Sequence, residues 1–279
     1  MPGRPGARTS PPCLSGGWTP MPRQPAPAAP RTAPAGALPP ERRALLAFLR
    51  EAGALQFEET TLRNGRVSPY FFNSGRVRTG AQLERLGEYY AAAIARCAPE
   101  ASIVFGPAYK GIPLCVAAAM ALSRRTGREI GYLFNRKEPK THGDAGRFVG
   151  REPGPGERLV LVDDVITDGG TKLEAVALLR AAFEAPIDAL VIAFNRMETD
   201  ASGEDAVARF EAATGIPIVP LLTVADLEQA LAEGGPETAG LPLPAPQLLE
   251  HIRAYRRRYG TGAPGAGGPG ASGPGAASA

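Results

Sequence analysis

Two uninterrupted apolar runs constrain the fold of this chain most strongly. LVLV spans residues 159–162 and ALVIAF spans residues 189–194, and neither run alternates with polar residues. Strands that are covered by helices on both faces have this pattern, whereas a strand with one face in water alternates. Amphipathic stretches separate the strand-like runs along the chain. We therefore expect an α/β fold with a mostly parallel central sheet flanked by helices.

The order of the expected elements supports this class. The expected helices span 41–51, 82–97, 112–124, 171–183, 204–213 and 248–259, and the expected strands span 102–105, 129–134, 158–162, 188–194 and 216–222. The pair Asn64-Gly65 lies between the short runs 56–62 and 67–73, which predicts a β-hairpin ahead of the sheet. Parallel sheets bind ligands beyond the carboxyl ends of their strands, so the residues after each strand are the candidates for a site.

The two ends of the chain differ from the middle in composition. The 34 glycines and 29 prolines are concentrated toward the ends, and no acidic residue precedes Glu41. These ends lack the apolar content that offsets the entropy of ordering a chain. We expect a disordered extension at 1–40, one folded domain at 41–260 and a disordered tail at 261–279.

The charge balance argues against nucleic acid as a partner. The whole chain has a formal net charge of +3, and residues 1–40 contain four arginines and no acid, which leaves −1 for the remainder. A nucleic-acid-binding fold needs a basic surface of its own, which this balance does not supply.

Cysteine usage and hydropathy indicate a cytoplasmic protein that is not bound to a membrane. The three cysteines form no C-x-x-C pair, and an odd count suits reduced thiols. No apolar run approaches the roughly 18 residues that a membrane span needs. The arginine-rich start has a composition similar to that of a transit peptide, but its prolines would break the amphipathic helix that such a peptide forms.

A short segment after the LVLV run carries the strongest chemical signal. It reads Val162-Asp163-Asp164-Val165-Ile166-Thr167-Asp168-Gly169-Gly170-Thr171 and leads into an expected helix. Backbone amides of a glycine loop and a helix N-terminus favour a phosphate group, and hydroxyls of Thr167 and Thr171 can add donors. The two carboxylates could accept hydrogen bonds from a sugar diol or help to hold Mg²⁺. The alternative is that Asp163 and Asp164 only form turns and caps. The segment fits neither a P-loop nor a dinucleotide fingerprint.

A second segment is a basic, glycine-containing stretch at 135–150, which we expect to be a mobile loop. Its basic side chains are Arg136, Lys137, Lys140, His142 and Arg147. Basic side chains on such a loop could close over an anionic ligand, stabilise its charge and exclude water. The alternative is a solvated surface loop.

Three further positions are candidates for the same crevice. Tyr109 and Lys110 follow the expected strand 102–105, between Gly106 and Gly111; Lys110 could instead be an ordinary surface lysine. Phe71 and Phe72 could offer a wall to a planar ring, although adjacent aromatics are more often core. Arg196 follows the strand 188–194 and suits an anionic acceptor, unless it forms an ordinary surface salt bridge.

Four segments together resemble the orotate phosphoribosyltransferases, a branch of the type I phosphoribosyltransferase family. They are the acid-pair segment 162–171, the basic stretch 135–143, the segment 105–111 and the segment 61–73. The resemblance covers 41–260 in order and spacing, and it implies a small N-terminal hood beside the sheet. It implies contacts with phosphoribosyl pyrophosphate (PRPP) for Arg63, Tyr109, Lys110, Arg136, Lys137, Lys140, His142, Asp163, Asp164, Val165, Ile166, Thr167, Asp168, Gly169, Gly170 and Thr171.

The same resemblance implies the acceptor site and the reaction. It places orotate at Phe71, Phe72, Thr167 and Arg196, and it makes Lys140, His142, Asp163 and Asp164 the catalytic group. The implied reaction converts orotate and PRPP into orotidine 5′-phosphate and pyrophosphate, with Mg²⁺ carried mainly by PRPP and no strong protein ligand to the metal. It also implies a homodimer with shared active sites.

Two positions depart from the family pattern. Arg63 stands where lysine is common, and Asp168 stands where many relatives have a small residue, which could cap the helix or weaken phosphate binding. Two alternatives to the implied activity remain open: a type I phosphoribosyltransferase for another base, and a PRPP-binding regulator. A regulator should show a damaged basic stretch or a nucleic-acid-binding face, and the sequence has neither.

Overall fold

The computed structural model describes residues 36–62, 64–140, 146–200 and 202–261. Its elements, in chain order, are α1 (Pro40–Glu51), β1 (Leu55–Gln56), β2 (Thr60–Thr61), β3 (Val67–Ser68), β4 (Phe71–Phe72), the 3₁₀ turn η1 (Ser74–Arg76), α2 (Gly80–Cys97), β5 (Ile103–Phe105), α3 (Gly111–Thr126), β6 (Gly131–Lys140), β7 (Gly146–Gly150), β8 (Leu159–Val165), α4 (Gly170–Ala182), β9 (Ile187–Asn195), α5 (Ala206–Thr214), β10 (Ile218–Thr223), α6 (Val224–Glu233), the 3₁₀ turn η2 (Pro236–Thr238) and α7 (Ala245–Tyr259).

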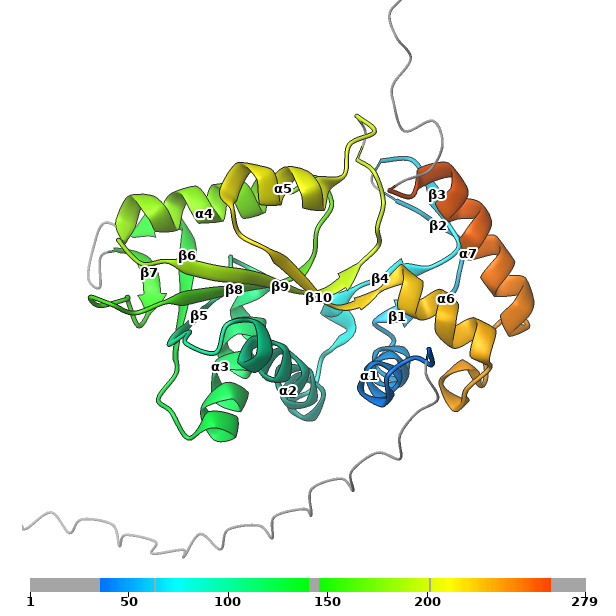
Figure 1. Ribbon diagram of the computed structural model, residues 1–279, viewed down its shortest axis with the longest axis horizontal. Helices are drawn as coiled ribbons and strands as arrows, with labels where there is room; N and C mark the ends of the chain where they lie inside the picture. Colours follow the sequence, from blue (N-terminus) through cyan, green and yellow to red (C-terminus); the bar gives the residue numbers. More distant parts are fainter. Residues whose placement is uncertain (1–35, 63, 141–145, 201, 262–279) are drawn as a thin grey trace, which may run out of the picture. The chain divides into compact units, whose positions relative to one another are not determined.

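A six-stranded sheet forms the centre of the domain, in the order β10-β9-β8-β5-β6-β7. Every neighbouring pair is parallel except β6 and β7, which are antiparallel at one edge. Helices α4 and α5 cover one face of the sheet, and α2 and α3 cover the other (Figure 1). The predicted α/β class with a mostly parallel sheet is confirmed.

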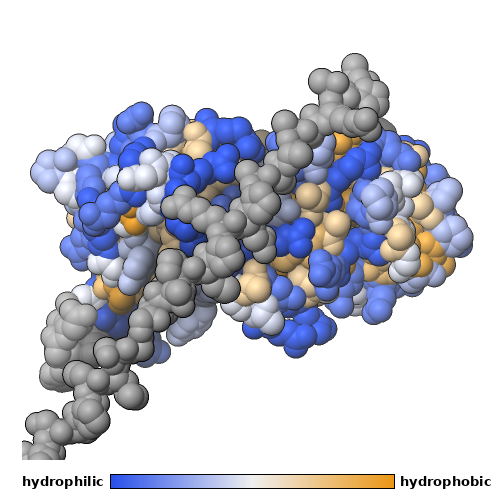
Figure 2. All heavy atoms as spheres, turned by 90° about the horizontal axis from the view of Figure 1, so that it is seen from below, coloured by the Kyte–Doolittle hydropathy of each residue, from blue (hydrophilic) through white to orange (hydrophobic). Residues whose placement is uncertain are grey.

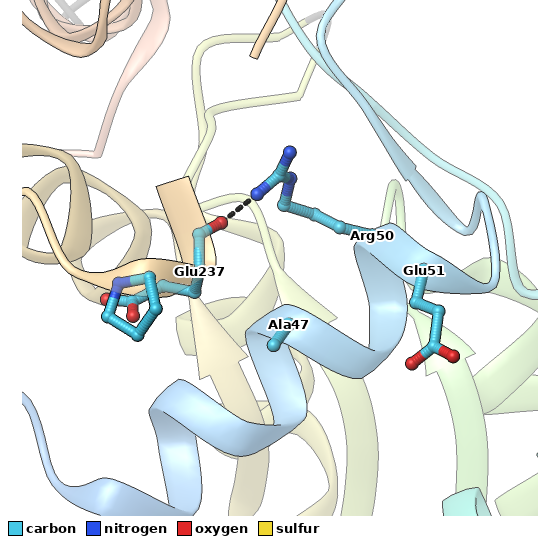
Figure 3. Close-up of a pocket in the computed structure, with 5 residues that line it drawn as sticks. Ala47, Arg50, Glu51 and Glu237 are labelled. Carbon is cyan, nitrogen blue, oxygen red and sulfur yellow. Dashed lines mark hydrogen bonds between the residues drawn. The ribbon is translucent and has the colours of Figure 1, made fainter. Parts of the chain in front are cut away.

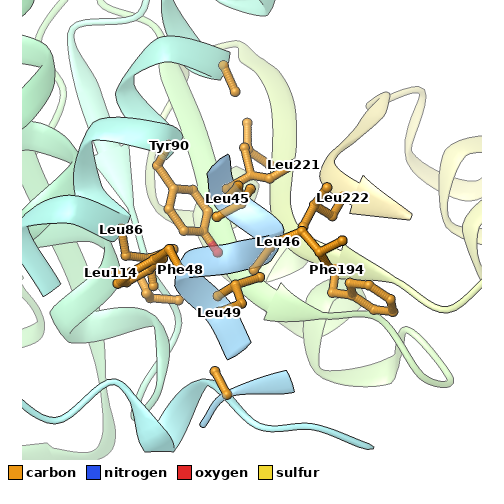
Figure 4. Packing of buried hydrophobic residues seen from close by; sticks show 14 of the residues in the cluster. Leu45, Leu46, Phe48, Leu49, Leu86, Tyr90, Leu114, Phe194, Leu221 and Leu222 are labelled. Atoms are coloured by element: carbon orange, nitrogen blue, oxygen red, sulfur yellow. The ribbon is translucent and has the colours of Figure 1, made fainter. Parts of the chain in front are cut away.

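The apolar runs explain why both faces are covered. Successive side chains of a strand point to opposite faces. In β9, Val191 packs in the core cluster on the side of α1, α2 and α3, while Ile192 packs in the cluster on the side of α4 and α5. Figure 4 shows the first cluster, where Leu45, Leu46 and Leu49 of α1 meet Leu86 and Tyr90 of α2 and Phe194 of β9.

The predicted hairpin is confirmed, in two pieces. β2 pairs with β3 around Asn64-Gly65, and β1 pairs with β4 further out, so that Leu55 faces Phe72. Gly65 has a φ of +79°, a value that glycine adopts without strain. These short strands, with η1, form the N-terminal region beside the sheet (Figure 1).

The folded domain starts earlier than the expected boundary at residue 41. Leu38 is 1% exposed, and its backbone N–H donates to Glu233 Oε1 at 3.1 Å. A single leucine in a proline- and alanine-rich stretch gave no periodic signal, which is why composition misplaced the boundary. The expected disorder at 1–35 and 262–279 lies outside the described residues and stays a prediction.

The surface of the described domain is mixed. On the face shown in Figure 2, hydrophobic residues form small groups among hydrophilic ones. No helix in the described ranges has the length and apolar character to cross a bilayer.

Candidate active site

The acid pair lies inside the end of β8 rather than after it, because the strand continues to Val165. This corrects the expected strand end at residue 162. Asp163 pairs in register with Ile192 of β9, so the sheet ladder extends past the apolar run. Both aspartates are buried. A carboxylate that is buried needs hydrogen bonds and counter-charges, and each of the two has its own set.

Asp164 is the point where three parts of the chain meet. Its Oδ2 accepts hydrogen bonds from Ser74 Oγ and Lys110 Nζ, both at 2.8 Å, and its Oδ1 accepts the N–H of Val165 at 2.8 Å. Burial acts to raise the pKa of Asp164, but the hydrogen bonds from Lys110 and Ser74 outweigh it and hold the pKa below its ordinary value. Asp164 is therefore a charged group that joins β8 to the N-terminal region and to the turn after β5.

Asp163 has a different set of partners. Its Oδ2 lies 2.6 Å from Lys172 Nζ, and its Oδ1 accepts the N–H of Asp164 at 2.9 Å. The hydroxyl of Tyr90 donates to the Asp163 carbonyl oxygen at 2.7 Å. Burial, reinforced by the charge of Asp164, raises the pKa of Asp163, while Lys172 opposes the rise.

The loop after β8 has the form expected for an anion site. Thr167, Asp168 and Thr171 are exposed, whereas Ile166 is buried and Val165 half-buried, so these two have mainly backbone groups to offer. Gly169 has a φ of +78° and precedes the first residue of α4, whose N-terminus opens on the loop. Amides that converge at a helix N-terminus favour a phosphate.

Asp168 acts as a local cap. Its Oδ1 accepts the N–H of Gly170 at 3.0 Å, and Arg209 of α5 donates to its carbonyl oxygen. The carboxylate thus occupies one of the amides at the start of α4.

The turn that carries Tyr109 and Lys110 is bound to β6 and closely packed on itself. The N–H of Ala108 donates to Asn135 Oδ1 of β6 at 3.1 Å. A Cβ at Gly106 would lie 2.1 Å from the Gly111 carbonyl oxygen, so the glycine is required by the close approach of the two backbones. The side chain of Lys110 is 59% exposed although its ammonium contacts Asp164.

The basic stretch 135–150 is an edge hairpin in its described part, not the loop that we expected. β6 runs on to Lys140, and β7 returns from Gly146, with Asn135 opposite Phe148. Phe148 packs against Phe105 and Phe183, which anchors the returning strand. The alternation in 146–150 is short and glycine-flanked, so it gave no strand signal. Gly150 also has a packing role, since a Cβ there would lie 2.1 Å from the Tyr132 carbonyl oxygen.

The base of this hairpin lies at the predicted donor site. Lys137 Nζ lies 5.1 Å from the centre of the Tyr109 ring, a cation–π contact, and Arg136 is half-buried on the same strand. Arg147 is exposed on β7. His142 and Arg63 lie outside the described residues, and the structure describes only the backbone of Lys140.

Arg196 lies just past the end of β9, as expected, but its ion pair with Glu198 is only about a tenth exposed (11% and 10%) rather than on the open surface. Its Nε donates to Glu198 Oε1 at 2.7 Å, and its Nη2 donates to Ser68 Oγ at 2.8 Å. The guanidinium also lies 4.3 Å from the centre of the Tyr70 ring. Burial acts to lower the pKa of Arg196, and the facing Tyr70 and Glu198 outweigh it and raise the pKa.

The two phenylalanines of β4 have different surroundings. Phe72 is buried and stacks on Phe194 with ring centres 5.5 Å apart, so its side chain belongs to the core. Phe71 is half-buried beside it. An acceptor ring at this segment could meet the side chain of Phe71, but only the backbone of Phe72.

The described residues contain no group of three or more His, Cys, Asp or Glu side chains that could hold a metal ion. A pocket between α1 and η2 is lined by Ala47, Arg50, Glu51, Pro236 and Glu237, so neither residue of the acid pair lines it (Figure 3). Arg50 donates there to the carbonyl oxygen of Glu237, as the dashed line shows. We assign no function to this pocket.

Comparison with known proteins decides the family. A scan against models of protein families returns no match. The orotate phosphoribosyltransferase of Thioalkalivibrio sulfidiphilus is 43% identical over 215 residues, which cover 77% of this chain and 96% of the relative. That of Chromohalobacter salexigens is 40% identical over 237 residues, covering 82% and 98%.

This chain belongs to the orotate phosphoribosyltransferases. The solved orotate phosphoribosyltransferase of Francisella tularensis has a TM-score of 0.66 and 32% identity, covering 78% of this chain and 100% of that one. A Mycobacterium tuberculosis orotate phosphoribosyltransferase in complex with PRPP has a TM-score of 0.51 and 22% identity, covering 67% and 99%, and shows the shared fold. The resemblance seen in the sequence is confirmed. Neither alternative, a transferase for another base or a regulator, is the family found.

Sequence reasoning missed four side chains that hold the orotate phosphoribosyltransferase site together: Ser74, Tyr90, Lys172 and Glu198. A signal existed for Lys172, because a lysine in the first turn of a helix opposes the helix dipole and calls for an acidic partner. A local signal also existed for Glu198, because its ion-pair partner Arg196 lies only two residues before it. For Ser74 and Tyr90, the partners lie 90 and 73 residues away in sequence, and no local pattern reveals them.

Proposed function

We propose that this protein transfers the 5-phosphoribosyl group of PRPP to orotate, giving orotidine 5′-phosphate and pyrophosphate. One observation carries the assignment of the site: Asp164 joins Lys110 of the donor turn to Ser74, which directly follows the acceptor segment 71–73. Donor and acceptor segments therefore meet at one buried carboxylate at the carboxyl end of the central strand β8.

The donor binds along the loop after β8. The backbone N–H groups of Ile166, Asp168 and Gly169 and the hydroxyls of Thr167 and Thr171 receive its 5-phosphate at the N-terminus of α4. The N–H of Gly170 joins them when the phosphate displaces the Asp168 carboxylate, while the N–H of Val165 stays bound to Asp164. Tyr109, Lys110, Arg136 and Lys137 face the pyrophosphate, together with Arg63, Lys140 and His142. The positive charges of the arginines and lysines among them stabilise the negative charge that develops on the leaving group, and Tyr109 contacts Lys137.

The acid pair contributes charge and orientation rather than a metal cage. Each of the four carboxylate oxygens of Asp163 and Asp164 already accepts a hydrogen bond or ion pair from the protein. Two lysines beside two carboxylates do not fit a strong divalent-cation site. Mg²⁺ therefore enters with the donor as its complex, and the pair faces the ribose.

The hairpin β6–β7 carries the groups that act on the leaving pyrophosphate. Lys140 ends β6 and His142 follows it in the sequence, and we assign both to the departure of the pyrophosphate, as the resemblance to the family implies. Covering the site also excludes water, which would otherwise capture the oxocarbenium-like transition state.

The acceptor lies against β4 and Arg196. Orotate is a planar anion, and the guanidinium of Arg196 offers fixed charge and a planar edge to its oxygens. Phe71 lines the ring, the backbone of Phe72 offers hydrogen-bonding groups, and Thr167 reaches the acceptor from the donor loop. The enzyme needs no covalent nucleophile, since a ring nitrogen of orotate attacks the ribose directly.

A second copy of the chain completes the proposal. Met120 on α3 and Tyr132 on β6 are among the exposed large hydrophobic residues, and α3 packs against β6. A homodimer over this region would cover both side chains and bring the hairpin of one copy to the site of the other.

Cys97 and Cys115 are free thiols in the structure, which agrees with the cytoplasm as its compartment.

The test of the assignment is a matched pair of variants. Asp164→Asn should weaken Mg²⁺–PRPP binding, measured by titration calorimetry, by at least about tenfold, because Lys110 and Ser74 lose the charged acceptor that positions them, and this loss outweighs the weaker repulsion of the anionic donor. Asp205→Asn is the control, since Asp205 caps α5 and asparagine caps equally well. Equal affinity of both variants for PRPP would contradict the role of Asp164. Sedimentation analysis of the wild type tests the dimer.

A further inference from the structure

The proposed function assigns no role to Lys172, although its ammonium is paired with Asp163 inside the site. Lys172 is the third residue of α4, and its ammonium lies 2.6 Å from Asp163 Oδ2. The Lys172 side chain is only 12% exposed, against 59% for Lys110, which pairs with the neighbouring Asp164. The two aspartates thus have one buried and one exposed counter-charge.

Without Asp163, the position of the Lys172 ammonium would be energetically unfavourable on two counts. A cation in the first turn of a helix opposes the positive N-terminal end of the helix dipole. A buried lysine also loses its hydration, and only a well-placed partner offsets that loss. Asp163 supplies the partner, so Lys172 and Asp163 hold α4 and β8 together beside the loop 165–171.

The groups around Asp163 come from three elements. Lys172 faces it from α4, Asp164 adjoins it on β8, and the hydroxyl of Tyr90 on α2 donates to its carbonyl oxygen. Of these three, only Lys172 carries a positive charge. Without it, Asp163 would be a buried carboxylate next to a second carboxylate.

The charges of this group add to zero. Asp163 and Asp164 contribute two negative charges, and Lys110 and Lys172 contribute two positive charges at distances of 2.8 and 2.6 Å from them. We call these four residues the floor of the site. PRPP is strongly anionic, so a floor with a net negative charge would repel it, whereas a neutral floor does not.

We propose that Lys172 is a positioning residue of the donor site: it is the permanent counter-charge of Asp163, which it holds in place, and it keeps the floor neutral toward the anionic donor. Lys110, the exposed lysine, is then left to contact the donor itself. This inference rests on the proposed function, because it takes PRPP as the ligand of the loop 165–171.

The test measures the affinity of four proteins for Mg²⁺–PRPP by titration calorimetry. Lys172→Met keeps the length of the side chain but removes its charge, and it should weaken binding by at least about tenfold, as expected for one unit charge near an anion in a partly buried site. Lys172→Arg should stay within about threefold of wild type because the charge is kept. Arg180→Met is the matched control, since Arg180 is exposed on the same helix and donates to the Thr214 carbonyl oxygen; it should bind as wild type does.

A double variant separates positioning from a merely structural role. Lys172→Met with Asp163→Asn removes one charge of each sign and restores a neutral floor, while the asparagine keeps the oxygen that accepts the Asp164 N–H. The double variant should bind PRPP at least about threefold more tightly than Lys172→Met alone, since the repulsion is gone. It also provides a folded protein if Lys172→Met alone melts too low to measure.

The outcomes are distinct. Equal affinity of wild type and Lys172→Met, or a double variant as weak as the single one, overturns the inference and leaves the proposed function standing. Failure of the wild type to bind Mg²⁺–PRPP overturns both.

Discussion

The guanidinium of Arg196 holds Glu198 with one edge: Glu198 Oε1 lies 2.7 Å from Nε and 2.6 Å from Nη2. Ser68 Oγ accepts the other hydrogen of Nη2, Nη1 has a long contact of 3.5 Å with the Tyr70 carbonyl oxygen, and the Tyr255 hydroxyl also accepts a hydrogen bond from the guanidinium. Because its contact with Tyr70 is long, the Nη1 edge is the part of Arg196 that can most readily exchange a partner for an anionic ligand. It is the edge that we assign to the acceptor.

The first prediction concerns this edge. Arg196→Ala should raise the KM for orotate by at least about tenfold, the scale of one lost charge-assisted hydrogen bond, with little change in PRPP binding. Arg196→Lys should not restore it, because one ammonium cannot hold Glu198, Ser68 and the acceptor together. Steady-state kinetics with each substrate varied in turn measures both effects. An equal loss for the two substrates would argue against the assignment.

The second prediction concerns the turn that carries Lys110. Gly106→Ala should lower both stability and PRPP affinity, because the added Cβ would lie 2.1 Å from the Gly111 carbonyl oxygen and must displace the turn. Gly80→Ala is the control, since nothing lies within 4 Å of a Cβ at that position. Thermal melting and titration calorimetry with PRPP report the two effects. Wild-type affinity in Gly106→Ala would show that the turn does not position the donor.

The N-terminal boundary yields the third prediction. A chain that starts at residue 41 loses the buried Leu38, whose burial contributes about 1.5–3 kcal/mol. For a domain of this size such a loss lowers the melting temperature by about 3–10 °C. A chain that starts at residue 36 should melt as the full chain does. If both shortened chains melt alike, the packing of Leu38 contributes nothing measurable.

Lys140 provides the fourth prediction. If the hairpin tip acts on the leaving pyrophosphate, Lys140→Ala should lower kcat by about 10²-fold or more while PRPP affinity changes far less, since charge develops only in the transition state. Rapid-quench measurement of a single turnover separates chemistry from product release. An unchanged rate of chemistry would remove Lys140 from the mechanism.

The fold could be predicted from the sequence because its elements have strong local signals. The runs at 159–162 and 189–194 gave the buried strands, and Asn64-Gly65 gave the hairpin. Helix α6 was not predicted, because its N-terminal capping box, formed by Thr223 and Asp226, has aspartate in place of the commoner glutamate or glutamine. Strand β7 was not predicted either, because its pairing with β6 and the packing of Phe148 stabilise it, and neither leaves a local sequence pattern.

The site was predictable in type but not in its connections. Asp163, Asp164, Lys110 and Arg196 lie at the carboxyl ends of strands, where the rule for parallel sheets places a ligand. Their partners were harder to predict: Ser74 lies 90 residues from Asp164, while Lys172 and Glu198 lie near Asp163 and Arg196 in sequence but belong to no recognised motif. Phe72 shows the opposite case, a motif residue whose side chain serves the core.

The proposed transfer of the phosphoribosyl group to orotate is tested most directly by measuring the consumption of orotate by the purified protein with PRPP and Mg²⁺. The same assay is carried out with uracil, hypoxanthine and adenine as acceptors. The use of PRPP as the donor tests the acid-pair loop, and the preference for orotate over the other bases tests Arg196. The account predicts orotidine 5′-phosphate and pyrophosphate in equal amounts from orotate, and at least about 10²-fold lower kcat/KM with the three neutral bases, because each lacks the anionic group that Arg196 recognises. Binding of PRPP without consumption of orotate, or a neutral base used as well as orotate, would contradict it.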